Sequence, residues 1–508
     1  MSSRADQPYA KPPTEHPTDQ AQRRAAPAAV GPLTAKPRRT PRAGIGRVAI
    51  TDVSPVAEGG RWPAKAVVGE AVPITATVFK EGHDAVGAAA VLTAPSGKVH
   101  SRTELKEVNK GLARWQGAVL VDAEGDWTFR VEAWSDPYLT WRHDAEIKIP
   151  AGQDVELVLE EGARLFERAG RRVGSTRAAA KAFAAAAELL RQESVHPGVR
   201  LAGATGGPAA RLLQADPLRQ QVTRSADYPL RVQRQRALVG NWYEVFPRSV
   251  GCHFSEAEGW VSGTLATCAD GIGRIAAMGF DVLYLTPIHP IGQSFRKGRN
   301  NALTARPGDP GSPYAIGSDA GGHDAIHPDL GTFEDFDALV AKARELGMEV
   351  ALDMALQCSP DHPWVRDHPE WFTRRPDGSI AYAENPPKKY QDIYPLSFET
   401  DPEGLYQEIL RVVRLWIAHG VTIFRVDNPH TKPLPFWERL IAQIGLEAPE
   451  VVFLAEAFTR PPMMRTLALV GFHQSYTYFA WRNTKDEVLD YLQEIAGEAG
   501  SFMRPAIW

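Results

Sequence analysis

The chain has 508 residues, 44% of them apolar and 23% charged, which is enough to bury several cores and predicts about three domains. Its 57 basic and 61 acidic side chains give a net charge of −4, which excludes strong attraction to nucleic acid or to an anionic membrane. Three cysteines and the lack of an 18-residue apolar run exclude a disulfide framework and a membrane-spanning helix, so we expect a cytoplasmic protein.

The first 150 residues fall into two parts. Residues 1–43 are rich in Pro, Ala and Arg and contain almost nothing to bury, so we expect a disordered tail. From 44 to 150, short alternating runs such as "AVPITATVFK", "DWTFRVEAWSD" and "HDAEIKIP" are separated by turn residues. This spacing is typical of an N-terminal β-sandwich domain of the immunoglobulin-like kind.

Three aromatic residues, Trp134, Tyr138 and Trp141, cluster in "WSDPYLTWRHD" near the end of this domain. They have two interpretations. The rings either stack on sugars at the surface or belong to a core or a domain contact, and residues of this kind are more often found in a core.

Residues 151–235 change to a helical period, as in "DVELVLEEGARLFERAG" and "STRAAAKAFAAAAELLRQES". We expect a small helical insert or bundle. Its alanine-rich face, Ala179 to Ala187, allows close packing with another helix, either in the same chain or in a partner.

From 236 to 508, near-continuous apolar strands alternate with amphipathic helices, a pattern that predicts a parallel sheet covered by helices. The strands end in polar residues, as the active face of a (β/α)8 barrel requires. A doubly wound sheet would favour a glycine-rich phosphate loop after its first strand, and "NWYEVFPRS" contains none. The fold class we predict is therefore α/β, a (β/α)8 TIM barrel preceded by the β-sandwich and the helical insert.

Successive strand ends carry the residues that suggest chemistry. They are Tyr243, Glu244, His289, Asp353, Arg425, Asp427 and Glu456. Asp427 and Glu456 end consecutive strands one βα unit apart, which is the arrangement of a glycosidase carboxylate pair.

Arg425 lies two residues before Asp427 and so shares its face of the strand. A fixed guanidinium would keep Asp427 ionised and oriented as a nucleophile. Glu456 follows the apolar run "VVFLA", a setting that suits an acid/base. The alternative interpretation is a set of structural ion pairs at a barrel rim. The order of these residues along the chain favours the catalytic interpretation over it. We expect neither a metal nor a cofactor, because the cysteine spacing matches no metal motif.

Several motifs resemble a known family. "IFRVDNPH" resembles the nucleophile motif of the α-amylase clan of retaining glycosidases, and "FLAEAF" resembles its acid/base strand. "DMALQCSPDHPWV", "RVDNPHTKPLPFWE", "SFRKGRNNAL", "GSPYAIGS", "ENPPKKYQDIYP" and "HQSYTYFAWRNTK" are similar to one subfamily, the bacterial α-1,4-glucan:maltose-1-phosphate maltosyltransferases of glycogen synthesis. The resemblance extends over about residues 44–503.

This resemblance implies a retaining transfer of maltosyl units from maltose 1-phosphate to an α-1,4-glucan, and a homodimer. Asp427 matches the nucleophile, Glu456 the general acid/base and Asp353 the structural Asp of the clan. Substrate-binding positions are matched by Lys297, Gln357, Asp392 and Asn428. Lys388, Lys389 and Tyr390 are near enough in sequence to serve the phosphate, although the sequence does not separate Lys388 from Lys389.

The clan uses a third carboxylate, which in this subfamily sits in an "NTPD" motif soon after "FMRP". Here the sequence reads "SFMRPAIW" and stops at Trp508. Asp486, in "NTKDEVLDYLQEIAG", opens an amphipathic helix instead. We therefore expect an incomplete barrel and impaired turnover. The alternatives are an α-glucan hydrolase of the same clan, or a non-catalytic remnant that binds glucan or dimerises.

Overall fold

The computed structural model describes residues 44–172, 176–257 and 259–506, and the expected tail at 1–43 lies outside the described residues. No helix in these ranges is both long and apolar enough to cross a membrane.

The first described part is built from β-strands. Nine strands join in the order β1-β3-β6-β5-β4-β7-β9-β2, with β8 paired to β7. Their bounds are β1 Ala49–Ser54, β2 Ala64–Val67, β3 Ala71–Phe79, β4 Val86–Thr93, β5 Val99–Asn109, β6 Arg114–Leu120, β7 Gly125–Ser135, β8 Gln220–Arg224 and β9 Tyr228–Gln233. Along β3 every second side chain, from Val72 to Val78, is buried, as a strand with one covered face requires. These side chains meet Phe129 and others from β4 and β7 in one core, so the expected β-rich domain is confirmed.

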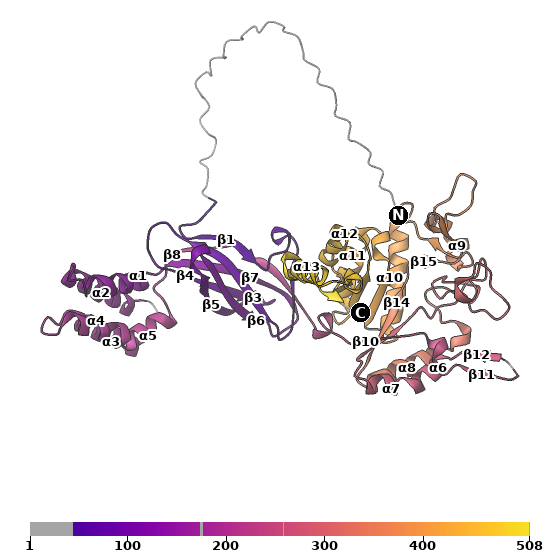
Figure 1. Cartoon of the computed structure of the whole chain (residues 1–508), viewed down its shortest axis with the longest axis horizontal. Coiled ribbons are helices and arrows are strands. Elements are labelled where there is room, and N and C mark those ends of the chain that lie inside the picture. Colours follow the sequence, from indigo (N-terminus) through magenta and orange to yellow (C-terminus); the bar gives the residue numbers. More distant parts are fainter. Residues whose placement is uncertain (1–43, 173–175, 258, 507–508) are drawn as a thin grey trace, which may run out of the picture. The chain divides into compact units, whose positions relative to one another are not determined.

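Five helices lie between β7 and β8 in the chain and pack around one small core (Figure 1). They are α1 Pro137–Lys148, α2 Val155–Gly170, α3 Arg177–Leu190, α4 Pro197–Gly206 and α5 Pro208–Ala215. The helices expected within 151–235 are present, but β8 and β9 in the same range are strands that pair with β7. The expectation of a wholly helical segment there is therefore wrong, because pairing with a distant strand decides the conformation of residues 220–233.

The strand expected over "HDAEIKIP" is also wrong, since most of these residues belong to α1. The Asp136 carboxylate accepts hydrogen bonds from the backbone N–H groups of Tyr138 and Leu139, at 3.0 and 2.9 Å, and Pro137 occupies the first turn. An acidic cap followed by proline is a strong start signal for a helix. It overrides the alternating pattern further along.

The aromatic cluster at the end of β7 is buried. Trp134, Tyr138 and Trp141 expose only 2%, 1% and 5% of their surface, and the Trp141 indole N–H donates to the Val158 carbonyl at 2.7 Å. The core interpretation is correct for these three residues, and a sugar-stacking surface is excluded.

The second part contains a parallel sheet in the order β10-β13-β14-β19-β20-β21-β22. Its strands are β10 Trp242–Val245, β13 Val282–Leu285, β14 Glu349–Met354, β19 Ile423–Asp427, β20 Val452–Glu456, β21 Gln474–Tyr476 and β22 Pro505–Ala506. Every neighbouring pair is parallel and follows chain order, with no reversal of the kind that defines a doubly wound sheet. The expected fold class, an incomplete (β/α)8 barrel after a β-rich domain, is confirmed.

Helices connect and cover these strands, and α10 to α12 lie next to one another near β14 (Figure 1). The helices are α6 Leu265–Gly271, α7 Gly273–Ala277, α8 Phe333–Glu345, α9 Pro363–Asp367, α10 Pro402–Ala418, α11 Leu434–Glu447, α12 Pro461–Leu469 and α13 Lys485–Ala496. Four short strands form two antiparallel pairs: β15 Gln357–Cys358 pairs with β18 Tyr394–Pro395, and β16 Ala383–Asn385 pairs with β17 Lys388–Tyr390.

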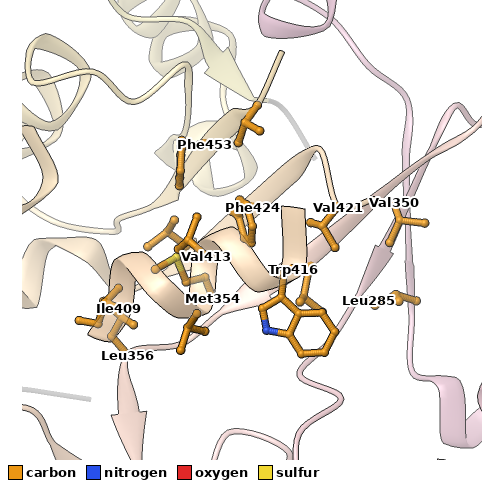
Figure 2. Close-up of a cluster of buried hydrophobic side chains, with 14 of the residues drawn as sticks. Leu285, Val350, Met354, Leu356, Ile409, Val413, Trp416, Val421, Phe424 and Phe453 are labelled. Carbon is orange, nitrogen blue, oxygen red and sulfur yellow. The ribbon is translucent and has the colours of Figure 1, made fainter. Parts of the chain in front are cut away.

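Trp416 anchors α10 to the sheet. Figure 2 shows its indole among apolar side chains from the strands, including Phe424 of β19, while Ile409 and Val413 extend the same helix face. The buried indole N–H is satisfied by the His323 carbonyl at 2.8 Å. This packing fixes β14 and β19, whose carboxyl ends hold the candidate catalytic residues.

Candidate active site

Three neighbouring strands bring their acidic ends together. In the parallel register, Asp353 of β14 lies opposite Arg425 of β19, and Asp427 of β19 lies opposite Glu456 of β20. Because parallel strands present their carboxyl ends at one edge, side chains distant in sequence become neighbours there.

The Arg425 guanidinium holds all three carboxylates. Its Nη1 lies 2.9 Å from Asp427 Oδ1 and 3.2 Å from Asp353 Oδ2, and its Nη2 lies 3.7 Å from Glu456 Oε1. Arg425 and Asp427 expose only 9% and 7% of their surface, so these charges are screened weakly by water. The rings of Tyr284 and Tyr476 flank the guanidinium at 5.8 Å each. The buried carboxylate that ends β19 is therefore paired with a cation, as the strand's sequence predicts.

Asp353 lies deepest and is 1% exposed. It accepts hydrogen bonds from the hydroxyls of Tyr284 and Tyr314, the latter at 3.1 Å, in addition to Arg425. Burial raises the pKa of Asp353, and the Arg425 cation opposes that rise. With its partners all within the protein, Asp353 is suited to holding Arg425 in place.

Asn428 connects the two catalytic candidates. Its side-chain amide donates to Asp427 Oδ2 and its backbone N–H donates to Glu456 Oε2, both at 3.2 Å. The residue has a φ of 45°, in the left-handed region that Asn tolerates better than most residues. This conformation turns the chain sharply after β19, so that one residue contacts both carboxylates.

Glu456 is half-buried. Burial and the neighbouring Asp427 raise the pKa of Glu456, and Arg425 together with the Asn428 N–H opposes the rise. A raised pKa is the direction that a carboxylic acid needs in order to donate a proton near neutral pH.

A cleft of about 740 Å³ opens above Asp427. The expected binding residues Lys297, Gln357, Tyr390, Asp392 and Asn428 all line it together with Asp427. The structure thus brings these residues together from four separate segments of the sequence. Arg425 and Asp353 lie beneath this lining, and Glu456 reaches it through its contact with Asn428.

Lys388 and Lys389 are equivalent candidates in the sequence, but they lie on opposite faces of β17. Alternation along β17 puts Lys388 on the same face as Tyr390, which lines the cleft, and Lys389 on the opposite face. Neither lysine is among the cleft-lining residues itself. Lys388 is thus the better placed of the two to approach a bound ligand.

The remaining strand-end residues do not reach the cleft. Glu244 is exposed on β10, and Tyr243 packs edge-on against Phe280. His289 is buried with its Nδ1 3.0 Å from the Ala325 carbonyl oxygen. Asp486 is exposed in the first turn of α13, as its sequence context predicts.

Sequence reasoning did not single out several residues of the site. Those are Tyr284, Tyr314, Asn385, His430 and Lys432. Tyr314 stands in the "GSPYAIGS" motif and Lys432 in "RVDNPHTKP", so the family motifs mark these two segments without marking the two positions. No local pattern marks Tyr284, a strand residue whose role depends on the neighbouring strand.

One group of potential metal ligands occurs in the described part of the chain, His323, Cys358 and His362, all buried. Hydrogen bonds assign the tautomers of the two histidines. His362 Nδ1 accepts from the Trp364 N–H, so its Nε2 carries the proton and donates to His323 Nδ1 at 3.0 Å, while His323 Nε2 donates to the Ala355 carbonyl. Since the His362 lone pair is already used, the arrangement favours a hydrogen-bonded imidazole pair over a metal site.

Comparison with known proteins identifies the family. Residues 46–234 match the model of the N/S domain of α-1,4-glucan:maltose-1-phosphate maltosyltransferase, and residues 244–404 match the α-amylase catalytic domain. An α-1,4-glucan:maltose-1-phosphate maltosyltransferase of Arcanobacterium haemolyticum is 58% identical over 466 residues, covering 91% of this chain and 67% of that protein. This chain belongs to the maltosyltransferase family.

Two further relatives carry the same description. A Streptomyces coelicolor maltosyltransferase is 58% identical over 461 residues, covering 91% of this chain and 67% of that protein. One from Mycolicibacterium smegmatis is 52% identical over 498 residues, covering 91% and 70%. The chain thus spans about two thirds of the length of these maltosyltransferases.

Replacement of Arg425 tests the electrostatic design of this maltosyltransferase site. We expect Arg425→Gln to lower the free energy of unfolding by about 3–5 kcal/mol, because two buried carboxylates and the half-buried Glu456 then lie close together without the Arg425 counter-charge. Urea unfolding at neutral pH measures the loss. The deficit should shrink as the pH is lowered, since protonation of the carboxylates relieves the repulsion.

Arg439→Gln is the matched control, because Arg439 pairs with Glu403 at the surface and should contribute far less. Equal losses in the two variants would contradict the special role of the buried cation.

Proposed function

We propose that this chain transfers a maltosyl unit from α-maltose 1-phosphate to the non-reducing end of an α-1,4-glucan and releases phosphate. The observation that carries the proposal is the Asp427–Glu456 pair on neighbouring strand ends, held by one guanidinium beneath an open cleft. The printed names of the relatives supply the two substrates.

The first step breaks the bond between the anomeric carbon and the phosphate oxygen. An Asp427 oxygen forms a bond to that carbon, the electron pair of the broken bond goes to phosphate, and the Glu456 proton is transferred to the phosphate oxygen. Arg425 and the Asn428 amide hold the attacking carboxylate, which reduces the entropy lost in reaching the transition state.

The second step transfers the maltosyl group to the acceptor. Glu456, now ionised, removes the proton from the glucan 4-hydroxyl, whose oxygen displaces Asp427 from the anomeric carbon. Two displacements restore the α configuration. Transfer prevails over hydrolysis where the bound glucan excludes water from the glycosyl-enzyme.

We assign five cleft-lining residues, and Lys388 on the same face of β17 as Tyr390, to substrate binding. Their common feature is a polar group that can contact a sugar hydroxyl or the phosphate: Lys297, Gln357, Asp392, Asn428, Lys388 and Tyr390. Lys297 Nζ lies 5.9 Å from the centroid of the Tyr390 ring. Burial raises the pKa of Asp392, and a backbone hydrogen bond together with the Lys297 cation opposes the rise. Lys297, Tyr390 and Asp392 all line the cleft.

The test is phosphate release from α-maltose 1-phosphate in the presence of a maltooligosaccharide. Acceptor-dependent release with elongation of the oligosaccharide is expected. Reducing sugar formed from starch without the phosphate donor would instead support the α-glucan hydrolase. If the 508-residue chain is silent, the same assay is applied after appending the region of the Streptomyces coelicolor relative that lies beyond the matched residues. Silence of that fusion would refute the proposal.

We also propose a cytoplasmic homodimer, with a functional division near residue 236 between the β-rich part and the barrel. The three cysteines are free thiols, and two of them are buried, which suits a reducing compartment. Exposed apolar residues on the helical segment, including Ile147, Leu157 and Val199, support a protein partner there. Sedimentation equilibrium measures the oligomeric state, and a monomer at all concentrations would exclude the dimer.

A further inference from the structure

Lys432 lines the same cleft, five residues after Asp427. Its Nζ donates to the carbonyl oxygen of Asn428 at 3.3 Å, and the Thr431 hydroxyl donates to that oxygen at 2.8 Å. The left-handed turn at Asn428 thus positions the ammonium group as well as the two carboxylates. A lysine held at its tip by a fixed carbonyl has less freedom than a surface lysine and costs less entropy to use.

The charge of Lys432 is not matched by a direct ion pair. Across residues 44–172, 176–257 and 259–506, no carboxylate oxygen lies within 4.0 Å of its Nζ. Asp427 and Glu456 are the acidic groups that act on it from farther away, and both are in contact with Arg425. Burial lowers the pKa of Lys432 to about 8, against the pull of these two carboxylates. Lys432 is therefore a cation that can form an ion pair with an anion bound in the cleft.

Two other lysines, one lining the cleft and one near it, have different surroundings. Lys297 is associated with Asp392 and Tyr390, and Lys388 is exposed on β17. Lys432 is the lysine whose electrostatic partners are the nucleophile and the acid/base themselves. An anion that leaves the anomeric carbon must lie beside the group that protonates it, and so within the field of Lys432.

We propose that Lys432 binds the phosphate group of the donor and stabilises its departure. The proposal rests on the proposed function and deepens it by naming a phosphate-specific residue. As the anomeric C–O bond breaks, its electron pair and the Glu456 proton both go to phosphate, Asp427 bonds to the carbon, and Lys432 remains protonated throughout. The cation acts on the oxygens where negative charge develops.

The same ammonium has a second consequence after phosphate has left. Its charge then acts on Glu456 without a bound anion to offset it, and it lowers the pKa of Glu456. That direction favours the ionised carboxylate, which the second step needs as a base. One lysine thus serves the leaving group first and the acid/base afterwards.

Calorimetric titration with α-maltose 1-phosphate and with maltose separates phosphate binding from sugar binding. We expect Lys432→Gln to weaken the binding of maltose 1-phosphate by about 10- to 100-fold, the value of a charge-assisted hydrogen bond, and to leave maltose affinity unchanged. Lys432→Arg should retain most of the preference for the phosphorylated sugar. Unchanged maltose binding also demonstrates that the variant cleft is folded.

Lys389→Gln is the matched control, because this lysine lies on the face of β17 opposite Tyr390 and should alter neither affinity. The Lys432 proposal is overturned if Lys432→Gln keeps the full preference for maltose 1-phosphate, or if it loses both ligands equally while Lys432→Arg does the same. A wild-type chain that does not prefer maltose 1-phosphate to maltose would contradict the proposed function itself.

Discussion

Replacing Asp427 by asparagine is expected to reduce phosphate release from α-maltose 1-phosphate by at least about 10⁴-fold, as loss of a nucleophile does in other covalent mechanisms. Asparagine has nearly the same shape and can keep a hydrogen bond to Arg425, but it cannot form the ester. The loss should therefore appear in turnover and not in maltose binding. Acceptor-dependent phosphate release measures the first, and calorimetry the second.

A trapping experiment locates the nucleophile directly. In a Glu456→Gln background, α-maltosyl fluoride should form a glycosyl-enzyme that deglycosylates slowly, because fluoride leaves with little proton assistance while the acceptor step lacks its base. Mass spectrometry of a digest should place one maltosyl unit on the peptide that ends β19. The double variant Asp427→Asn, Glu456→Gln should remain unlabelled. A maltosyl group on another carboxylate, such as Asp392, would assign the nucleophile elsewhere.

Glu456→Gln is expected to lower phosphate release by about 10²- to 10⁴-fold, the range for loss of a general acid/base. The effect on the first step should depend on the leaving group, since phosphate needs more assistance from a proton than fluoride does. Single-turnover rates with the two donors measure this ratio. Equal losses with both donors would indicate a structural role for Glu456 instead.

The pH dependence follows from the raised pKa of Glu456. Because the first step needs the protonated acid, its single-turnover rate should be highest below that pKa and should fall as the pH rises through it. Glu456→Gln has no titrating group at this position and should lose this limb of the profile. Persistence of the limb in the variant would assign it to a different group.

Local sequence was sufficient for much of the barrel. The apolar run before Arg425 and the amphipathic pattern of α10 predicted a strand and a helix correctly, because each depends on the spacing of side chains within a few residues. The two-residue spacing of Arg425 and Asp427 also placed both side chains on one face of β19, and the structure bears this out. Family motifs added the positions of Lys297, Gln357 and Asp392, which do line the cleft.

Local pattern was misleading where a stronger signal or a distant partner decided the conformation. In α1 the Asp136 cap outweighed the alternation of the residues that follow. Residues 220–233 became strands because β7 offered them backbone partners, and a pairing so distant in sequence leaves no periodic mark in a short segment.

By itself, then, the sequence determined the kinds of elements, their order and the acidic ends of β19 and β20. Tertiary structure alone decided which groups surround them: the hydroxyls of Tyr284 and Tyr314 on Asp353, the contact between Arg425 and Glu456, and the place of Lys432 in the cleft lining. The physical reason is that helix and strand periods reflect interactions between near neighbours, whereas these contacts join separate strands and loops whose proximity depends on the closure of the parallel sheet.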